Sequence, residues 1–146
     1  SLLGRAQLRL ERHEAALGTF ERRLRDAPEK DGSHFFIGET LRRLGRCEEA
    51  LQAFAAELEN VRSGYATAAG FGRAQALRAC GRNDEAVEAY RAYLGLRPDD
   101  VEAWQELVTL LAELGRVDEA AGANASAARA LAVRERSLLP PMPRYW

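Results

Sequence analysis

Histidine and cysteine are the residue types best suited to bind a metal or to carry nucleophilic chemistry, and the chain has two of each. His13 and His34 are 21 residues apart, and neither stands in a metal-ligand motif. Cys47 and Cys80 are too few for a disulfide framework, so we expect small, buried and unreactive side chains. Phosphate-binding loops and nucleophile elbows are missing. The sequence therefore predicts no enzyme, no metal site and no cofactor.

The segment PPMPRYW at residues 140–146 is the other chemically distinctive stretch. Its adjacent prolines stop a helix and favour extended polyproline geometry. Tyr145 and Trp146 then bring two large aromatic side chains to the end of the sequence. Three alternatives stay open for this tail: disorder, packing on its own last repeat, and docking into a neighbouring molecule. The third would produce self-association through Tyr145 and Trp146.

Composition restricts the class of protein. The chain has 146 residues, of which 47% are hydrophobic and 29% charged, with a formal net charge of −1. These values are typical of a soluble globular domain and give no reason to expect a nucleic acid as partner. No apolar run approaches the roughly 18 residues that a membrane span needs. We expect a cytoplasmic protein that interacts with neither nucleic acid nor membrane.

An internal repeat is the strongest signal in the sequence. Three stretches share the order glycine, arginine, any residue, two acids, alanine: LGRCEEALQAF from Leu44, CGRNDEAVEAY from Cys80 and LGRVDEAAGAN from Leu114. Their glycines are separated by 36 and 34 residues. One more copy, LERHEAALGTF, precedes these three and is therefore the first along the chain; it begins at Leu10 and has Glu11 in place of the glycine. One structural unit is therefore repeated along the chain.

Each copy predicts a turn between two helices, because glycine ends one helix and acidic residues favour the start of the next. Pro28 and Pro98 are expected to close the second helices of their copies. The longer 36-residue spacing predicts a longer turn near residues 62–64. The last copy has Asn124 where an aromatic residue would otherwise pack, so Asn124 should be exposed. It also has Ala132 in place of a closing proline, so its second helix should run from about 117 to at least 134.

These features resemble the tetratricopeptide repeat, a family with period 34 and the pattern W-x2-L-G-x2-Y, then A-x3-F, then P. Trp104 and Leu107 fill the first two positions in the fourth copy. The A-x3-F positions hold Ala16 and Phe20, Ala50 and Phe54, and Ala86 and Tyr90. The resemblance covers about residues 1–134. It implies an all-α, right-handed solenoid of antiparallel helix pairs, with about four repeats and a long C-terminal capping helix.

The resemblance also implies a domain division. A helical repeat domain should occupy residues 1–139, and the tail residues 140–146. The repeats should lie at about 1–30, 31–64, 67–100 and 101–134.

In this family the first helix of each repeat lines an inner groove that binds a protein or a peptide. The positions that carry over to this groove are Arg5, Arg9, Phe35, Glu39, Arg42, Arg43, Phe71, Gln75, Arg78, Glu102, Gln105, Thr109 and Glu113. The groove should be basic with two aromatic residues in the first three copies, and acidic in the last. A partner with acidic and aromatic groups would complement it.

Two functions follow from the resemblance. The first is a non-catalytic adaptor that binds a protein or peptide in the concave groove of the superhelix. The alternative is a structural, regulatory or oligomerising module of a larger protein whose active domain is absent here. A native protein much longer than this chain, with a catalytic domain, would favour the alternative.

Overall fold

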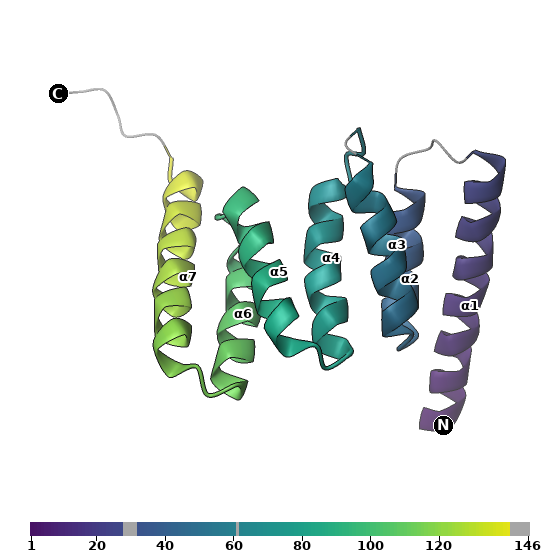
Figure 1. Ribbon diagram of the computed structural model, residues 1–146, viewed down its shortest axis with the longest axis horizontal. Helices are drawn as coiled ribbons and strands as arrows, with labels where there is room; N and C mark the ends of the chain where they lie inside the picture. The colour runs from purple at the N-terminus through teal and green to yellow at the C-terminus, as the bar shows by residue number, and fades with distance from the viewer. Residues whose placement is uncertain (28–31, 61, 141–146) are drawn as a thin grey trace. The chain divides into compact units, whose positions relative to one another are not determined.

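The computed structural model describes residues 1–27, 32–60 and 62–140, and every regular element in this part is an α-helix (Figure 1). The helices are α1 (Leu2–Asp26), α2 (Ser33–Arg43), α3 (Cys47–Glu59), α4 (Ala66–Ala79), α5 (Asn83–Leu96), α6 (Val101–Glu113) and α7 (Val117–Leu138). They form two compact units, Ser1–Ala89 and Tyr90–Trp146, which divide within α5. The predicted all-α class is confirmed. None of the described helices is both long and apolar enough to cross a membrane.

Three of the four predicted turns are present, and each depends on a glycine with left-handed backbone geometry. Gly45, Gly81 and Gly115 have φ angles of 78°, 75° and 73°. At the first turn, the Gly45 and Arg46 amides donate to carbonyls of the last turn of α2, at 3.0 and 2.9 Å. The other two turns repeat this pattern. It is the Schellman motif, which ends a helix and reverses the chain.

The arginine after each of these glycines forms a two-bond ion pair with a glutamate three residues later. The pairs are Arg46 with Glu49, Arg82 with Glu85, and Arg116 with Glu119, and their shorter bonds measure 2.6, 2.7 and 2.7 Å. The hydrogen bond from the arginine lowers the pKa of each glutamate carboxyl. Each pair therefore joins a turn to the first turn of the helix that follows.

The predicted turn of the first copy is wrong. Helix α1 runs without interruption through residues 10–15, where the sequence pattern placed a reversal. Glu11 occupies the position of the turn glycine, and no described residue other than glycine has a positive φ angle. A side chain at this position disfavours the left-handed conformation that ends a helix. One long helix therefore replaces the expected helix pair.

The core of the first unit is organised around the ring of Phe54 in α3, which is fully buried. Two glycines face this ring, Gly38 from α2 and Gly72 from α4. A Cβ atom added to Gly72 would lie 2.5 Å from Phe54 Cζ, and one added to Gly38 would lie 2.7 Å from Phe54 Cε1. Since real Cβ contacts essentially never fall below 3.0 Å, the ring fits only because these positions lack side chains. The surrounding apolar residues are Leu17, Ile37, Leu41, Ala50, Ala53, Ala69 and Ala76.

The connection between α3 and α4 spans residues 60–65, whereas that between α5 and α6 spans only 97–100. The expected longer turn is therefore confirmed. The buried carboxylate of Glu57 holds this connection in place. It accepts hydrogen bonds from the Ser63 hydroxyl and, at 3.2 Å, from the Gly32 amide at the start of α2.

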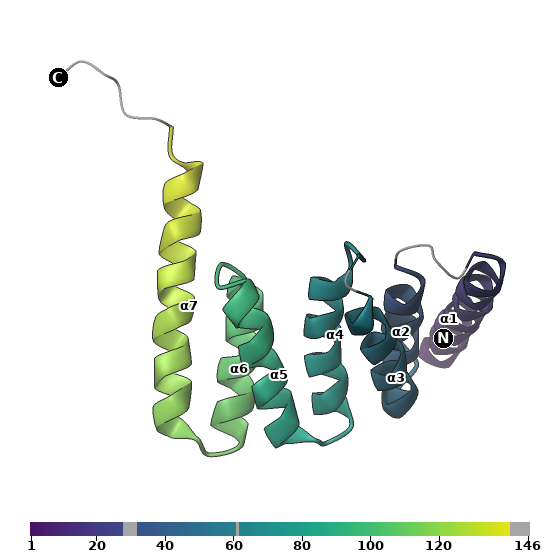
Figure 2. The same ribbon diagram turned by 45° about the horizontal axis from the view of Figure 1, so that its top comes forward.

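In the second unit α6 and α7 pack side by side in opposite directions (Figures 1 and 2). Helix α7 buries a row of alanines, namely Ala120, Ala123, Ala127 and Ala130, which allow close approach. Asn124 is exposed, and α7 continues to Leu138, well past the N-terminal end of its antiparallel neighbour α6 (Figure 2). Both expectations for the last helix are confirmed. Helix α5 ends two residues before Pro98, as predicted.

Cys47 and Cys80 form a disulfide, so the expectation of two buried, unreactive side chains is wrong. Each cysteine adjoins one of the glycine turns, and both side chains are half-buried. The repeat brings equivalent turns next to each other, which places residues 33 positions apart at a Cα–Cα distance of 5.6 Å. The cysteine count thus no longer supports a cytoplasmic location, which stays a prediction.

Two other expectations concern residues outside the described part of the chain. One is the helix-closing role of Pro28. The other is the fate of the tail at 141–146, including self-association through Tyr145 and Trp146.

Replacing Gly72 with alanine should destabilise the first unit by about 1–3 kcal/mol, because the new methyl group overlaps the Phe54 ring. Gly18→Ala in α1 is the matched control, since nothing lies within 4 Å of its added Cβ. This control should stabilise the protein by about 0.5–1 kcal/mol through helix propensity. Urea unfolding measures both free energies. An equal stabilisation by the two substitutions would contradict the packing described for Phe54.

Candidate functional site: a basic and aromatic surface on α1 and α2

A cavity of about 360 Å³ lies between α1 and α2. Three of the predicted groove residues, Phe35, Glu39 and Arg43, line it. The remaining lining residues are His13, Ala16, Phe20, Phe36 and Thr40. The cavity lies at a helix–helix junction, where its walls are held by the packing of both helices.

Stacked aromatic rings form the apolar wall of the cavity. Phe20 stacks on Phe36 with ring centroids 5.3 Å apart. Phe35 stacks on Tyr65 at 5.4 Å and meets the ring of Phe36 edge-on at 5.3 Å. These geometries are the favourable ones for aromatic pairs. The wall therefore presents fixed apolar surface to a ligand.

Some polar side chains of the cavity have hydrogen-bond partners within the chain, whereas Arg43 has none among the described residues. Glu39 accepts two hydrogen bonds from Arg42, at 3.4 and 3.1 Å, so its charge is compensated. The Thr40 hydroxyl donates to the Phe36 carbonyl at 2.8 Å. Arg43 is exposed, and among the described residues its guanidinium group has no acidic partner. Arg43 is therefore available to an anionic group of a ligand.

A second hollow of about 380 Å³ runs along α1 and shares His13 with the cavity. It is lined by Arg5, Leu8, Arg9, Arg12 and His13. Within the described ranges, none of these three arginines forms a salt bridge. We call the cavity and this hollow together the α1–α2 surface. It combines an aromatic wall with four guanidinium groups that form no salt bridge with any residue the structure describes.

The sequence located part of this surface and missed the rest. Phe20 was assigned to helix packing, and Phe36 stood next to the chosen Phe35. Arg12 and His13 were missed because the predicted turn at this point took them off the face shared by Arg5 and Arg9. On one continuous helix, residues three or four positions apart lie on the same face. The continuity of α1 is thus the signal that would have found them.

The predicted groove residues of α4 are Phe71, Gln75 and Arg78, which are all half-buried. They line neither part of the α1–α2 surface. Arg42 is also absent from its lining, since it is engaged with Glu39. The structure therefore brings Arg5 and Arg9 of α1 together with Phe35, Glu39 and Arg43 of α2, whereas the predicted residues of α4 do not line this surface.

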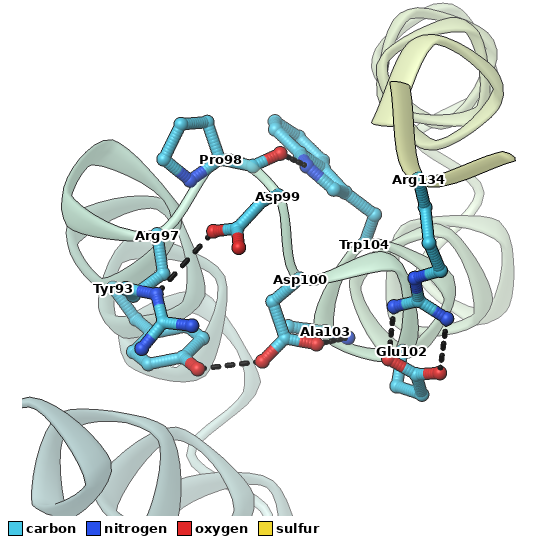
Figure 3. Close-up of polar contacts among 9 residues, drawn as sticks. All are labelled: Tyr93, Arg97, Pro98, Asp99, Asp100, Glu102, Ala103, Trp104 and Arg134. Carbon is cyan, nitrogen blue, oxygen red and sulfur yellow. Dashed lines mark hydrogen bonds and ion pairs between the residues drawn. The ribbon is translucent and has the colours of Figure 1, made fainter. Parts of the chain in front are cut away.

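The predicted residues of α6 belong to the second unit and are exposed: Glu102, Gln105, Thr109 and Glu113. Glu102 accepts two hydrogen bonds of 3.1 Å from Arg134 of α7 (Figure 3). This hydrogen bonding lowers the pKa of Glu102 to about 2. A residue of the same chain thus compensates the negative charge expected to face a ligand here.

The second unit has a hollow of its own, of about 390 Å³, beside Trp104. The polar groups around it are paired within the chain. Trp104 Nε1 donates to the Pro98 carbonyl at 3.0 Å, and Arg97 pairs with Asp99 at 3.3 Å (Figure 3). Arg129 donates to Ser126 at 2.9 Å. This hollow therefore offers a ligand fewer unpaired charges than the α1–α2 surface.

Beside that hollow, a buried tyrosine anchors the connection from α5 to α6. The Tyr93 hydroxyl donates to Asp100 at 2.5 Å, and Asp100 also accepts from the Ala103 amide at the start of α6 (Figure 3). Burial, with the hydrogen bond to Asp100, raises the pKa of Tyr93 to about 12. These polar groups hold the connection in place.

Family comparison decides the identity of the scaffold. Models described as tetratricopeptide repeat match residues 1–65 and residues 67–110. The chain belongs to the tetratricopeptide repeat family. The first match contains every residue that lines the α1–α2 surface. Tetratricopeptide repeats are protein-interaction scaffolds, and this is the general role of the chain.

Solved structures agree with this tetratricopeptide fold. A MamA chain from Desulfovibrio magneticus RS-1 is 18% identical, with a TM-score of 0.75 over 95% of this chain and 75% of that one. A structure titled as MamA protein is 16% identical, with a TM-score of 0.77 over 97% and 76%. MamA AMB-1 is 24% identical, with a TM-score of 0.69 over 95% and 76%. These identities show the fold alone. No curated protein matches the chain.

Replacing Arg134 with glutamine should return the pKa of Glu102 from about 2 toward 4.5, because it removes the main group stabilising the carboxylate. The depressed pKa means that the pair's contribution to stability is present above pH 4.5 and is lost as the pH falls toward 2. Carboxyl-carbon NMR titration measures the change. Arg129→Gln on the same helix is the control and should leave the pKa of Glu102 unaltered. An ordinary pKa for Glu102 in the unmodified protein would contradict the pairing.

Proposed function

We propose that the α1–α2 surface binds a segment of a partner protein that carries several carboxylates and one aromatic side chain. The observation that carries this proposal is the set of four guanidinium groups without acidic partners, in the described part of the chain, beside an aromatic cavity. They belong to Arg5, Arg9, Arg12 and Arg43. The general role of the family is to hold other proteins, and this surface is the site that we propose for that role in this chain.

The chemistry of the surface supports a ligand of this composition. Guanidinium groups bind carboxylates through charge-assisted, often two-bond contacts, which are stronger than neutral hydrogen bonds. An aromatic side chain in a cavity bordered by Phe20, Phe35 and Phe36 would leave water and stack on fixed rings. Anchors of this kind supply much of the energy in protein interfaces. The charges would set register and association rate.

The surface is suited to binding rather than to catalysis. The one hydroxyl among its lining residues belongs to Thr40 and is bonded to a backbone carbonyl. The lining has no cysteine or lysine, and His13 has no carboxylate orienting it among the described residues. An activated nucleophile needs a base within hydrogen-bond reach, and that base needs an orienting group. We therefore assign no catalytic step to this surface.

An alternative proposal is a structural, regulatory or oligomerising module of a larger protein. The exposure of apolar side chains on α1 favours it, since Leu2, Leu3 and Leu10 are 85%, 71% and 53% exposed. Exposed apolar clusters are common at contacts with another chain. In that case leucines rather than arginines would dominate the contact. Sedimentation would show association that is lost in Leu3→Lys and retained in Arg9→Glu.

Charge reversal on the α1–α2 surface should weaken binding of an acidic, aromatic peptide. The probe is a fluorescent synthetic peptide with one tryptophan flanked by glutamates. Arg9→Glu and Arg43→Glu should each raise its Kd by roughly tenfold or more, because an attractive ionic contact becomes repulsive. Added salt should also weaken binding to the unmodified protein. Fluorescence anisotropy measures both effects.

Two controls separate the surface from general electrostatics. Arg22→Glu changes an exposed arginine of α1 that lines neither hollow, and it should leave the Kd nearly unaltered. Peptides with glutamine for glutamate or alanine for tryptophan should bind more weakly than the probe. The proposal fails if all three arginine variants bind alike, or if the glutamine peptide binds as tightly as the acidic one.

A further inference from the structure

The Cys47–Cys80 disulfide connects two successive glycine turns of the repeat. Cys47 is the first residue of α3, two positions after Gly45, and Cys80 is the cap residue of α4, directly before Gly81. Their Cα atoms are 5.6 Å apart, which lies at the most common separation for a disulfide. The backbone of the repeat thus positions the two cysteines to be joined without rearrangement of α3 or α4.

The cross-link closes a loop that contains all of α3 and α4, over a sequence separation of 33 residues. Elsewhere in this loop, Phe54 of α3 packs against Gly72 of α4. The end near the cysteines is also spanned by a Glu48–Arg82 ion pair of 3.4 Å, which is exposed. Exposed ion pairs contribute little to stability. The covalent bond therefore restrains this end of the α3–α4 pair more strongly than the ion pair does.

Both cysteine residues are half-buried rather than fully buried, so part of each is exposed to solvent. Cys47 also stands at the N-terminus of α3, where the helix dipole favours negative charge on sulfur. Thiol–disulfide exchange proceeds through the thiolate and requires access to the sulfur. The fold supplies both conditions at one site.

We propose that Cys47 and Cys80 are a reversible redox pair that exchanges with glutathione-class or dithiol-protein thiols, and that their oxidation fastens α3 to α4. In the oxidising direction, one cysteine thiolate attacks oxidised glutathione, forms a mixed disulfide and releases one glutathione thiolate. The other cysteine thiolate attacks the protein sulfur of that mixed disulfide and releases the second. The two cysteine sulfurs are oxidised, and oxidised glutathione is reduced to two thiols, which take up the two protons that the cysteine thiols lose.

The size of the effect follows from the length of the closed loop. Cross-linking a loop of this length lowers the entropy of the unfolded chain and so stabilises the folded state. By thermodynamic linkage, folding favours formation of the disulfide by the same free energy. The chain-entropy relation gives a preference of roughly 100- to 1,000-fold for disulfide formation in the folded over the unfolded protein. The corresponding rise in melting temperature on oxidation is roughly 10 °C.

The test equilibrates the whole chain in mixtures of reduced and oxidised glutathione, with and without urea. Acid quenching, alkylation of free thiols and mass spectrometry then count the disulfide-bonded fraction. The oxidation constant should be roughly 100- to 1,000-fold larger in the folded protein than in urea. Addition of dithiothreitol should return both cysteines to alkylatable thiols while the protein stays helical.

Thermal unfolding provides the second measurement. The oxidised chain should melt roughly 10 °C above the reduced chain. Cys47→Ser and Cys80→Ser should each melt near the reduced chain and show no response to dithiothreitol. Equal oxidation constants in the folded and unfolded protein would overturn the proposal. So would a folded protein whose cysteines stay fully alkylatable in oxidised glutathione, or one whose disulfide resists dithiothreitol until the helices unfold.

Discussion

The packing of Phe54 against two glycines is the constraint on which the first unit depends. A single ring in α3 touches α2 at Gly38 and α4 at Gly72, and both contacts are closer than a side chain would allow. Because protein interiors are close-packed, this contact fixes how near the three helices can approach. The small residues Ala50, Ala53, Ala69 and Ala76 around the ring extend the same close approach.

The proposed binding surface follows from this packing. Phe35 lies within ring contact of both Phe54 and Tyr65, so the core extends directly into the aromatic wall of the cavity. Phe36, the next residue along α2, stacks on Phe20 of α1. The wall is therefore continuous with the core, whereas the arginines project from helices that the core already holds. Apolar contacts held by the core, combined with exposed charged side chains, suit recognition of a peptide.

The sequence predicted those parts of the fold that have a local cause. The turns at Gly45, Gly81 and Gly115 were foreseeable because a left-handed residue is a local requirement that glycine meets best. The same argument explains why the turn predicted at Glu11 is wrong. We expected that turn from the spacing of the repeat, although the position lacks the glycine that such a turn requires. Phe35 was foreseeable from its repeat position, since that position sets which face of α2 it occupies.

Features that depend on contacts between distant residues were not foreseeable in this way. The Cys47–Cys80 bond requires the distance between two turns, which no local pattern contains. The pairing of Glu102 with Arg134 depends on how α7 packs on α6. A repeat pattern assigns residues to faces of helices. It does not state which charges on those faces neutralise one another.

Mapping the bound peptide by NMR tests the central claim most directly. Isotope-labelled protein would be titrated with the acidic tryptophan peptide while the backbone amide signals are followed. The account predicts that the largest shifts occur at His13, Phe36 and Arg43 and their neighbours on α1 and α2. Shifts concentrated at Trp104 and Val133, or no saturable shifts at all, would contradict the assignment of the α1–α2 surface as the binding site.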